Sequence, residues 1–169
     1  MLIPNNKQET KLFQYANTAR FAYNWALGRE KENYKNGGKF LSDGELRKEF
    51  TQLKKADEYS WLNEISNNVT KQAIKDACNA YKRFFTGYSG FPKFKSRKHF
   101  TPSFYQDNVK IQFTENHVKV EGFTTSKRKN KQKLNWIRIA ENNRIPTNCK
   151  YTNPRIKYDG LNWYLTVGI

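Results

Sequence analysis

The sequence predicts an α+β protein, with helices in the N-terminal half and a small, mostly antiparallel sheet or barrel in the C-terminal half. Up to about residue 85, apolar residues recur at steps of three and four, which is the period of an amphipathic helix. From about residue 109 they alternate with polar residues, as they do in half-buried strands. Near the C-terminus, Asp159-Gly160 separates two apolar runs and gives the usual signature of a β-hairpin.

The N-terminal segment predicts a short strand followed by a long helix. Residues 1–4 have the pattern of the end of a strand, and the helical period begins directly after them. Gly37-Gly38 then ends the helix, because two glycines in succession disfavour helical backbone. The positions on its apolar face are Leu12, Tyr15, Ala16, Ala19, Tyr23, Ala26 and Leu27.

Two further helices are predicted before residue 86. Ser42 stands three residues before Glu45, which is the spacing of a capping box, and the helix that it starts runs to about Ala56. Trp61-Leu62 anchors the connection, and a third helix begins at Ser66 or Asn67 and continues to about Phe85. Its apolar face carries Val69, Ala73, Ala77, Tyr81 and Phe84, and its other face carries Lys71, Lys75, Lys82 and Arg83.

The strands predicted after residue 108 form two hairpins and one single strand. Residues 109–113 and 118–120 alternate around a turn at Glu115-Asn116, and residues 136–139 form a further strand. Residues 155–158 and 163–167 form the second hairpin, with Asp159-Gly160 in a type I′ turn. Residues 127–133 are expected to be a mobile loop on this sheet.

Positive charge dominates the sequence and is unevenly distributed. The chain has 31 Lys or Arg and 15 Asp or Glu, which gives a net charge of +16. Residues 71–133 hold fifteen of these cations and four acids, and no acid lies in 77–106 or in 122–140. Such a charge favours a polyanionic partner, of which nucleic acid is the most common, although a solvated basic surface without a partner has the same pattern.

Within the first acid-free run, residues 90–98 read Gly-Phe-Pro-Lys-Phe-Lys-Ser-Arg-Lys, so that aromatic and basic residues alternate. Cations hold phosphates, and rings can stack on bases or sugars. On the first helix, Arg20 and Asn24 are four residues apart beside three aromatic residues, and they are expected either to cap a neighbouring segment or to hold a phosphate.

Other functional classes find little support in the sequence. The acids are scattered, and no nucleophile–histidine arrangement or phosphate-binding glycine loop is present, so we expect neither catalysis nor a metal or other cofactor. Cys78 and Cys149 form no pair with zinc-ligand spacing, and Cys78 fits a small core residue. No signal peptide or membrane-spanning run is evident, so we expect an intracellular, cytoplasmic protein.

Short motifs follow one another along nearly the whole chain. They are Pro4-Asn5-x-x-Gln8, Arg20-Phe21-x-Tyr23-Asn24-Trp25, Trp61-Leu62, Ala80-Tyr81-x-x-Phe84-Phe85, Gly90-Phe91-Pro92-x-Phe94-Lys95, Trp136-x-Arg138 and Trp163-Tyr164. Taken in this order, the motifs resemble the N-terminal half of TnpB-type proteins. These are the OrfB proteins of bacterial insertion sequences, RNA-guided DNA nucleases related to type V CRISPR effectors.

This resemblance implies a helical recognition domain inserted into a small antiparallel β-barrel, the wedge domain, which is similar to an OB-fold. Residues 1–4 would be a remnant of the first wedge strand, residues 5–98 the recognition domain, and residues 99–169 the rest of the barrel. With its first strand so short, the barrel is expected to be incomplete or to have an open edge. The RuvC-like nuclease domain of the family would follow, so its catalytic acids are expected to be absent here.

The resemblance also assigns roles to individual residues. Guide RNA and double-stranded DNA beside the target are the implied partners. Asn67, Asn68 and Lys71, together with the segment Phe104-Tyr105-Gln106, are expected to read the duplex, because Asn and Gln suit adenine and Lys suits guanine or phosphate; Phe104 is equally suited to the core. The other expected nucleic-acid contacts are Arg20, Asn24, Lys75, Lys82, Arg83, Lys93, Lys95, Arg97, Lys98, Lys127, Arg128 and Lys129.

Three functions are therefore compared. The first is a nucleic-acid-binding module of this family without a nuclease centre. The second is a shortened relative that sequesters guide RNA or blocks an RNA-guided nuclease. The third is a stand-alone DNA-binding regulator whose first two helices form a helix-turn-helix; the position of the basic charge, mostly after those helices, disfavours it.

Overall fold

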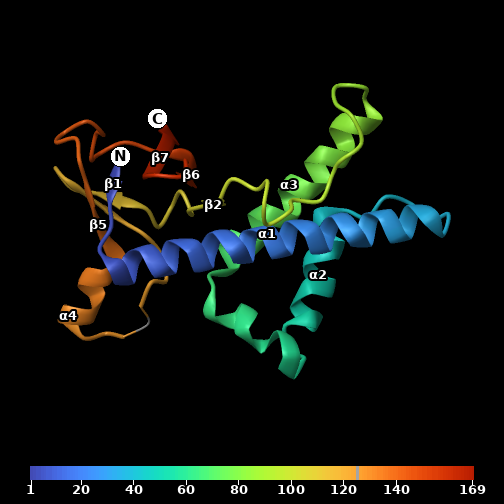
Figure 1. The fold of residues 1–169 in the computed structure, drawn as a ribbon, viewed down its shortest axis with the longest axis horizontal. Helices are drawn as coiled ribbons and strands as arrows, with labels where there is room; N and C mark the ends of the chain where they lie inside the picture. Colours follow the sequence, from blue (N-terminus) through green and yellow to red (C-terminus); the bar gives the residue numbers. More distant parts are fainter. Residues whose placement is uncertain (125) are drawn as a thin grey trace. The chain divides into compact units, whose positions relative to one another are not determined.

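A computed structural model describes residues 1–124 and 126–169 (Figure 1). The chain divides into two compact units, one of residues 1–17 and 101–169, the other of residues 18–100. The α+β class with an antiparallel sheet is confirmed. The first seventeen residues, which include the start of a long helix, group with the strands, so the division falls at residues 17–18 and 100–101.

The unit of residues 18–100 is helical and contains most of the first helix. The three predicted helices are confirmed as α1 (Asn6–Lys35), α2 (Asp43–Leu53) and α3 (Asn67–Phe85), with a 3-10 stretch, η1 (Asp57–Glu64), before α3. Gly37, at a φ of 74°, follows the end of α1, a backbone conformation that glycine adopts without strain. Ser42 and Glu45 form the predicted capping box, and Ser66 caps α3.

Aromatic and aliphatic side chains fill the core of this unit. Trp25 on α1 meets Phe50 on α2 with ring centroids 5.1 Å apart, and Arg29 pairs with Glu49 at 2.7 Å. Leu62, the buried member of the Trp61-Leu62 pair, anchors η1, whereas Trp61 stays partly exposed against Phe21. Val69, Ala73, Ala77 and Tyr81 on the apolar face of α3 are buried as predicted, whereas Phe84 is half-buried. Cys78 is buried too.

The other unit is built on one antiparallel sheet. Its strands are β1 (Leu2–Ile3), β2 (Ser103–Tyr105), β3 (Gln112–Phe113), β4 (His117–Lys119), β5 (Trp136–Ile139), β6 (Thr152–Tyr158) and β7 (Trp163–Gly168). They lie in the order β2-β6-β7-β1-β5-β4-β3. Among the described residues the pairing does not return from β3 to β2, so the sheet is open and the closed barrel is not confirmed.

The expectation that the barrel is incomplete or has an open edge is confirmed, because the described sheet has open edges at β2 and β3. The short β1 is not itself an edge strand and lies between β5 and β7. Leu2 is opposite both Ile139 and Trp163, whereas Ile3 is opposite Arg138.

The connections between strands differ from the prediction in detail. β6 and β7 pair up to Tyr158 and Trp163, so the loop holds four residues instead of the two of a type I′ turn. The Asp159 carboxylate accepts hydrogen bonds from the backbone of Leu161 and Asn162, which stabilises this longer loop. The segment expected to be a mobile loop contains two short helices, α4 (Lys129–Gln132) and η2 (Lys133–Asn135).

The start of α1 is fixed in this unit by the motif Pro4-Asn5-x-x-Gln8. Asn5 and Gln8 exchange backbone-to-side-chain hydrogen bonds of 3.0 and 2.8 Å, which is the geometry of a capping box. The buried Gln8 amide also donates to the carbonyls of Leu134 and Trp136, at the start of β5. One glutamine thus caps the helix and joins it to the sheet, which gives this motif a structural role.

Glu30 on α1 generates a prediction about pH. Its side chain is buried, Oε2 accepts a hydrogen bond from the Leu41 backbone, and burial raises the pKa to about 7. The unfolded chain loses this proton near pH 4.5, so the folded state binds more protons between those values and its stability falls as the pH rises from about 4.5 to 7. Glu30→Gln keeps the acceptor and removes the titration. Relative to the wild type, the variant should gain about 1 to 3 kcal/mol between pH 5 and pH 8.

Urea unfolding at the two pH values measures this difference. Glu58→Gln, in an exposed position on η1, is the matched control. A Glu30→Gln variant whose stability relative to the wild type is the same at both pH values would contradict the buried-acid account.

Candidate nucleic-acid interface

The basic segment 90–98 is held on α1 by a paired hydrogen bond. The Asn24 side chain donates from Nδ2 to the Lys95 carbonyl at 2.9 Å and accepts from the Lys95 N–H at 2.8 Å. Arg20, one turn earlier, donates to the same carbonyl at 3.4 Å. Of the two roles expected for Arg20 and Asn24, the structure shows capping of a neighbouring segment. One amide satisfies both backbone groups of Lys95 and so fixes the extended segment at its middle.

The rings of this segment pack on the helices. Phe91 meets Tyr81 and Phe84 of α3, with centroids 5.7 and 5.1 Å away. Lys31 of α1 lies with Nζ 4.1 Å from the centroid of the Phe94 ring. Gly28 faces that ring too, and a Cβ there would lie 3.8 Å from it. With its backbone and rings attached to the helices, the segment can direct other side chains outward.

Three cations of the segment are displayed in this way, and a fourth is used internally. Lys93, Arg97 and Lys98 are exposed, and none of them forms an ion pair with another described residue. Lys95 differs, because its Nζ lies 4.0 Å from the centroid of the Tyr23 ring and it is only half-exposed. The four were expected to act alike, but Lys95 is partly engaged by an aromatic face.

A second group of cations forms a stripe along α3. At about 100° per residue, Lys71, Lys75 and Lys82 fall within a narrow sector of the helix surface. All three are exposed, and Arg83, also exposed, lies about 80° around the helix from the edge of this sector. In the part of the chain that the structure describes, these four residues form no ion pair. We call Lys71, Lys75 and Lys82 the α3 stripe.

The first turn of α3 presents polar side chains beside this stripe. Ser66 accepts a hydrogen bond from the Asn68 backbone and so defines the start of the helix. Asn67 is exposed, and its Oδ1 accepts a hydrogen bond from Lys54 Nζ. Asn68 is half-buried. The helix start therefore offers amide groups and Lys71 on adjoining positions.

The segment Phe104-Tyr105-Gln106 corrects the expectation of duplex reading. Phe104 is buried against Tyr15, with ring centroids 5.4 Å apart. Gln106 is only 2% exposed, and its Oε1 accepts a hydrogen bond from the backbone of Glu121. A side chain buried in this way cannot reach a base edge. Tyr105 is half-exposed, with Arg155 5.5 Å from its ring centroid.

The remaining predicted contacts lie in the sheet unit. Lys127, Arg128 and Lys129 are exposed, and Lys129 begins α4. Within residues 1–124 and 126–169, no three His, Cys, Asp or Glu side chains gather as a metal site requires. In the same residues, none of the helices has both the length and the hydropathy of a membrane span.

A family model and two curated proteins are similar in sequence to this chain. A family model described as a helix-turn-helix domain, from the OrfB proteins of IS605-type elements, matches residues 1–39. A protein of Escherichia coli (strain K12) named "Putative RNA-guided DNA endonuclease InsQ" is 27% identical over 166 residues, which cover 98% of this chain and 38% of that protein. A Streptomyces pristinaespiralis protein named "Putative RNA-guided DNA endonuclease" is 28% identical over 95 residues, 56% of this chain and 24% of its own length.

The chain is related to the TnpB/OrfB-type proteins. It spans between about a quarter and two fifths of the length of these curated relatives. A helix-turn-helix is a DNA-binding motif, so the family match points to DNA binding. The matched residues 1–39 comprise β1, the single long helix α1 and the start of the connection to α2.

Several exposed residues near the segment were not predicted as contacts. Tyr34 and Tyr88 are 70% and 86% exposed, and Lys31 and Lys35 lie on the same part of α1 as Tyr34. Helical periodicity does not single out such positions, because it identifies the buried face. The sequence does indicate exposed rings in another way, because residues 81–94 contain more aromatic side chains than one helix face can bury.

Replacing Asn24 tests whether the basic segment 90–98 is fixed through α1. Asn24→Ala leaves the Lys95 N–H without its acceptor, and the Lys95 C=O keeps the longer contact from Arg20, which costs about 1 to 3 kcal/mol of local stability. Amide hydrogen exchange at Lys95 should therefore accelerate about tenfold or more. Asn79→Ala, at an exposed position on α3, is the control and should leave that rate unchanged. Equal exchange rates in the wild type and Asn24→Ala would contradict the role assigned to Asn24.

Replacing Gln106 separates a structural role from base reading. Gln106→Met removes the acceptor of the Glu121 N–H and should lower stability by about 1 to 3 kcal/mol, measured by urea unfolding. Affinity for a duplex should stay within about twofold of the wild type, because the side chain is buried. A variant with wild-type stability and altered sequence preference would show that Gln106 reads bases after all.

Proposed function

We propose that this chain is a nucleic-acid-binding module of a TnpB-type protein, which grips guide RNA and duplex DNA beside the target. The observation that carries the proposal is the pair of cation groups in residues 18–100. Lys93, Arg97 and Lys98 on the segment and the α3 stripe are exposed and lack ion-pair partners among the described residues. The names of the two relatives support nucleic acid as the partner.

Phosphate binding is the chemistry that these cations suit best. A cation that already pairs with a carboxylate must give up that partner to bind phosphate, whereas an unpaired cation only releases water and counterions. Phosphate contacts position a nucleic acid without reading its sequence. In this proposal the first turn of α3 reads the sequence: Asn67 and Asn68 meet base edges in the major groove, and Lys71 beside them holds a phosphate.

The sheet unit is the counterpart of the wedge domain in this proposal. Its antiparallel order supports the assignment, and closure into a barrel is part of the proposal, since the described sheet is open. Lys127, Arg128 and Lys129 would hold the phosphate backbone of the bound RNA. The proposal for this chain is limited to binding and assigns it no cleavage.

The first two helices favour this module over a stand-alone helix-turn-helix regulator. A helix-turn-helix joins its two helices by a turn of about three or four residues. Here α1 ends at Lys35 and α2 begins at Asp43, so residues 36–42 separate them. We therefore assign the recognition role to α3, which also carries the α3 stripe.

Salt dependence of affinity tests the proposal. In Lys71→Gln/Lys75→Gln/Lys82→Gln, three phosphate contacts are removed and helix propensity is kept. The slope of log affinity against log salt for a duplex should fall in magnitude by up to about 3, at roughly 0.9 per contact. Fluorescence anisotropy with a labelled duplex and a labelled RNA hairpin, each over a range of salt concentrations, measures the slopes.

The control removes the same charge elsewhere. Lys7, Lys48 and Lys55 are exposed and lie outside both cation groups, so Lys7→Gln/Lys48→Gln/Lys55→Gln lowers the net charge equally. The proposal requires the stripe variant to lose much more affinity than this control. Equal losses would show that only net charge matters, and no binding to either nucleic acid by the wild type would refute the proposed function.

A further inference from the structure

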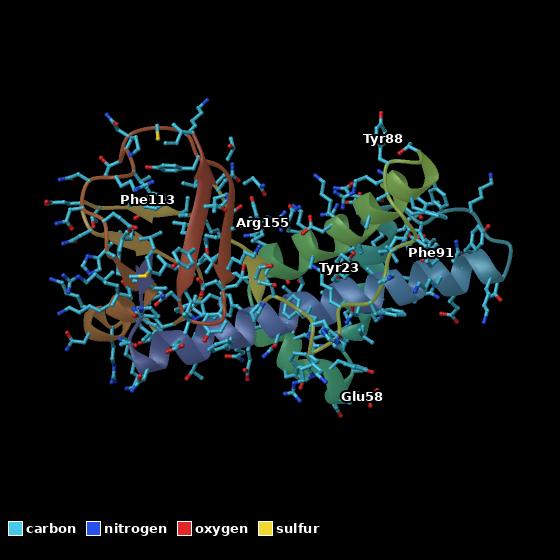
Figure 2. All side chains as sticks on the ribbon, turned by 45° about the horizontal axis from the view of Figure 1, so that its top comes forward. Tyr23, Glu58, Tyr88, Phe91, Phe113 and Arg155 are labelled. Atoms are coloured by element: carbon cyan, nitrogen blue, oxygen red, sulfur yellow. The ribbon has the colours of Figure 1, made fainter. Side chains whose placement is uncertain are left out.

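Around the ends of α1 and α3, the helical unit exposes an unusual number of aromatic rings. We call this set the aromatic strip; it consists of Tyr34, Phe40, Phe85, Tyr88, Phe91 and Phe94. All but Phe40 are among the exposed large apolar side chains, and Tyr88 is the most exposed of these at 86%. Figure 2 shows Tyr88 pointing away from the turn that follows α3, and Phe91 on the segment that returns from it.

Ring contacts connect members of the strip, so that they form a supported surface. Phe40 meets Phe85 edge to face with centroids 5.8 Å apart. Tyr81, which is buried, contacts both Phe85 and Phe91, at 6.0 and 5.7 Å. Rings held at one edge and open at the other keep an apolar face available to a ligand.

Cations lie among these rings. The ammonium of Lys31 is 5.1 Å from the Phe91 centroid and 4.1 Å from the Phe94 centroid. Lys31, Lys35, Tyr34 and Phe91, together with Glu32, line a shallow hollow of about 470 Å³. Glu32 is the one acid of this lining, and its carboxylate pairs with Arg29 at 2.8 Å. The hollow thus combines aromatic faces with positive charge and is within the size range of small-molecule sites.

This combination distinguishes the strip from an ordinary protein-docking patch. Interfaces for a basic protein partner would need acids, and those for an apolar partner would not need ammonium groups at the rings. Unpaired nucleotides satisfy both features, since each base has a π-face that stacks on a ring and each linkage carries a negative charge. A duplex cannot use the rings in this way, because its bases are already stacked on each other.

We propose that the aromatic strip binds unpaired nucleotides, with one base in the hollow lined by Tyr34 and Phe91 and neighbouring phosphates held by Lys31 and Lys35. The inference rests on the proposed function and extends it, because it assigns a separate site to the single-stranded part of the nucleic acid. Stacking on rings does not distinguish RNA from DNA, so either strand chemistry fits the site.

The test replaces three rings and compares two kinds of nucleic acid. Tyr34→Leu/Tyr88→Leu/Phe91→Leu keeps apolar bulk where Phe91 packs, so the fold is retained while the aromatic faces are lost. Fluorescence anisotropy is measured with an oligo-dT, an oligo-rU and a hairpin duplex of equal phosphate number. The variant should bind the two unpaired strands about tenfold more weakly or worse, and the duplex within about twofold of the wild type. Trp61→Leu, on η1 and outside the strip, is the matched control and should change neither.

A base analogue gives an independent readout. In an oligonucleotide containing 2-aminopurine, stacking on the strip should quench the fluorescence in the presence of the wild type and not of the triple variant. Unchanged affinity of the triple variant for both unpaired strands overturns the inference, as does an equal loss for duplex and unpaired strands. If the wild type binds duplex but no unpaired strand, this inference alone is contradicted. If the wild type binds neither kind of nucleic acid, the proposed function is contradicted as well. If the replacements abolish self-association in sedimentation instead, the strip is a protein interface and the inference is wrong.

Discussion

The hydrogen bonds between Asn24 and the backbone of Lys95 are the interaction on which the candidate interface depends. An extended segment outside helices and strands has backbone groups that no regular structure satisfies, and here one side-chain amide satisfies two of them. Because α1 supplies that amide, the segment takes its position from the longest helix of the chain. Lys93, Arg97 and Lys98 then face solvent, and none of them forms an ion pair with a carboxylate among the described residues.

A division of labour between rings and charges follows from this arrangement. Phe91 and Phe94 attach the segment to the helices through Tyr81, Phe84 and Lys31. Lys93, Arg97 and Lys98 need no such contacts and stay free for a polyanion. Lys95 is only partly displayed to solvent, because its ammonium lies over the Tyr23 ring. The alternation of aromatic and basic residues in the sequence is thus an alternation of anchoring and displayed side chains.

The helices and most strands could be predicted because each depends on local patterns. The capping box at Ser42 and the apolar period of α3 are properties of neighbouring residues, and both are present in the structure. Gln106 could not be placed in this way, since an alternating segment does not show whether a given polar side chain faces the core. The position of β1 inside the sheet depends on pairing with β5 and β7, more than a hundred residues away. Local preference carries no information about such distant partners, nor about the longer loop between β6 and β7.

Lysine footprinting of the wild-type protein tests the central claim most directly, namely that these unpaired cations hold a nucleic acid. Each lysine is acylated with an amine-reactive reagent, with and without a saturating amount of RNA hairpin or duplex, and the rates are read by mass spectrometry. The account predicts that Lys71, Lys75, Lys82, Lys93 and Lys98 become protected while Lys48 and Lys55 react at unchanged rates. Protection centred on Lys48 and Lys55, or spread evenly over all lysines, would contradict it.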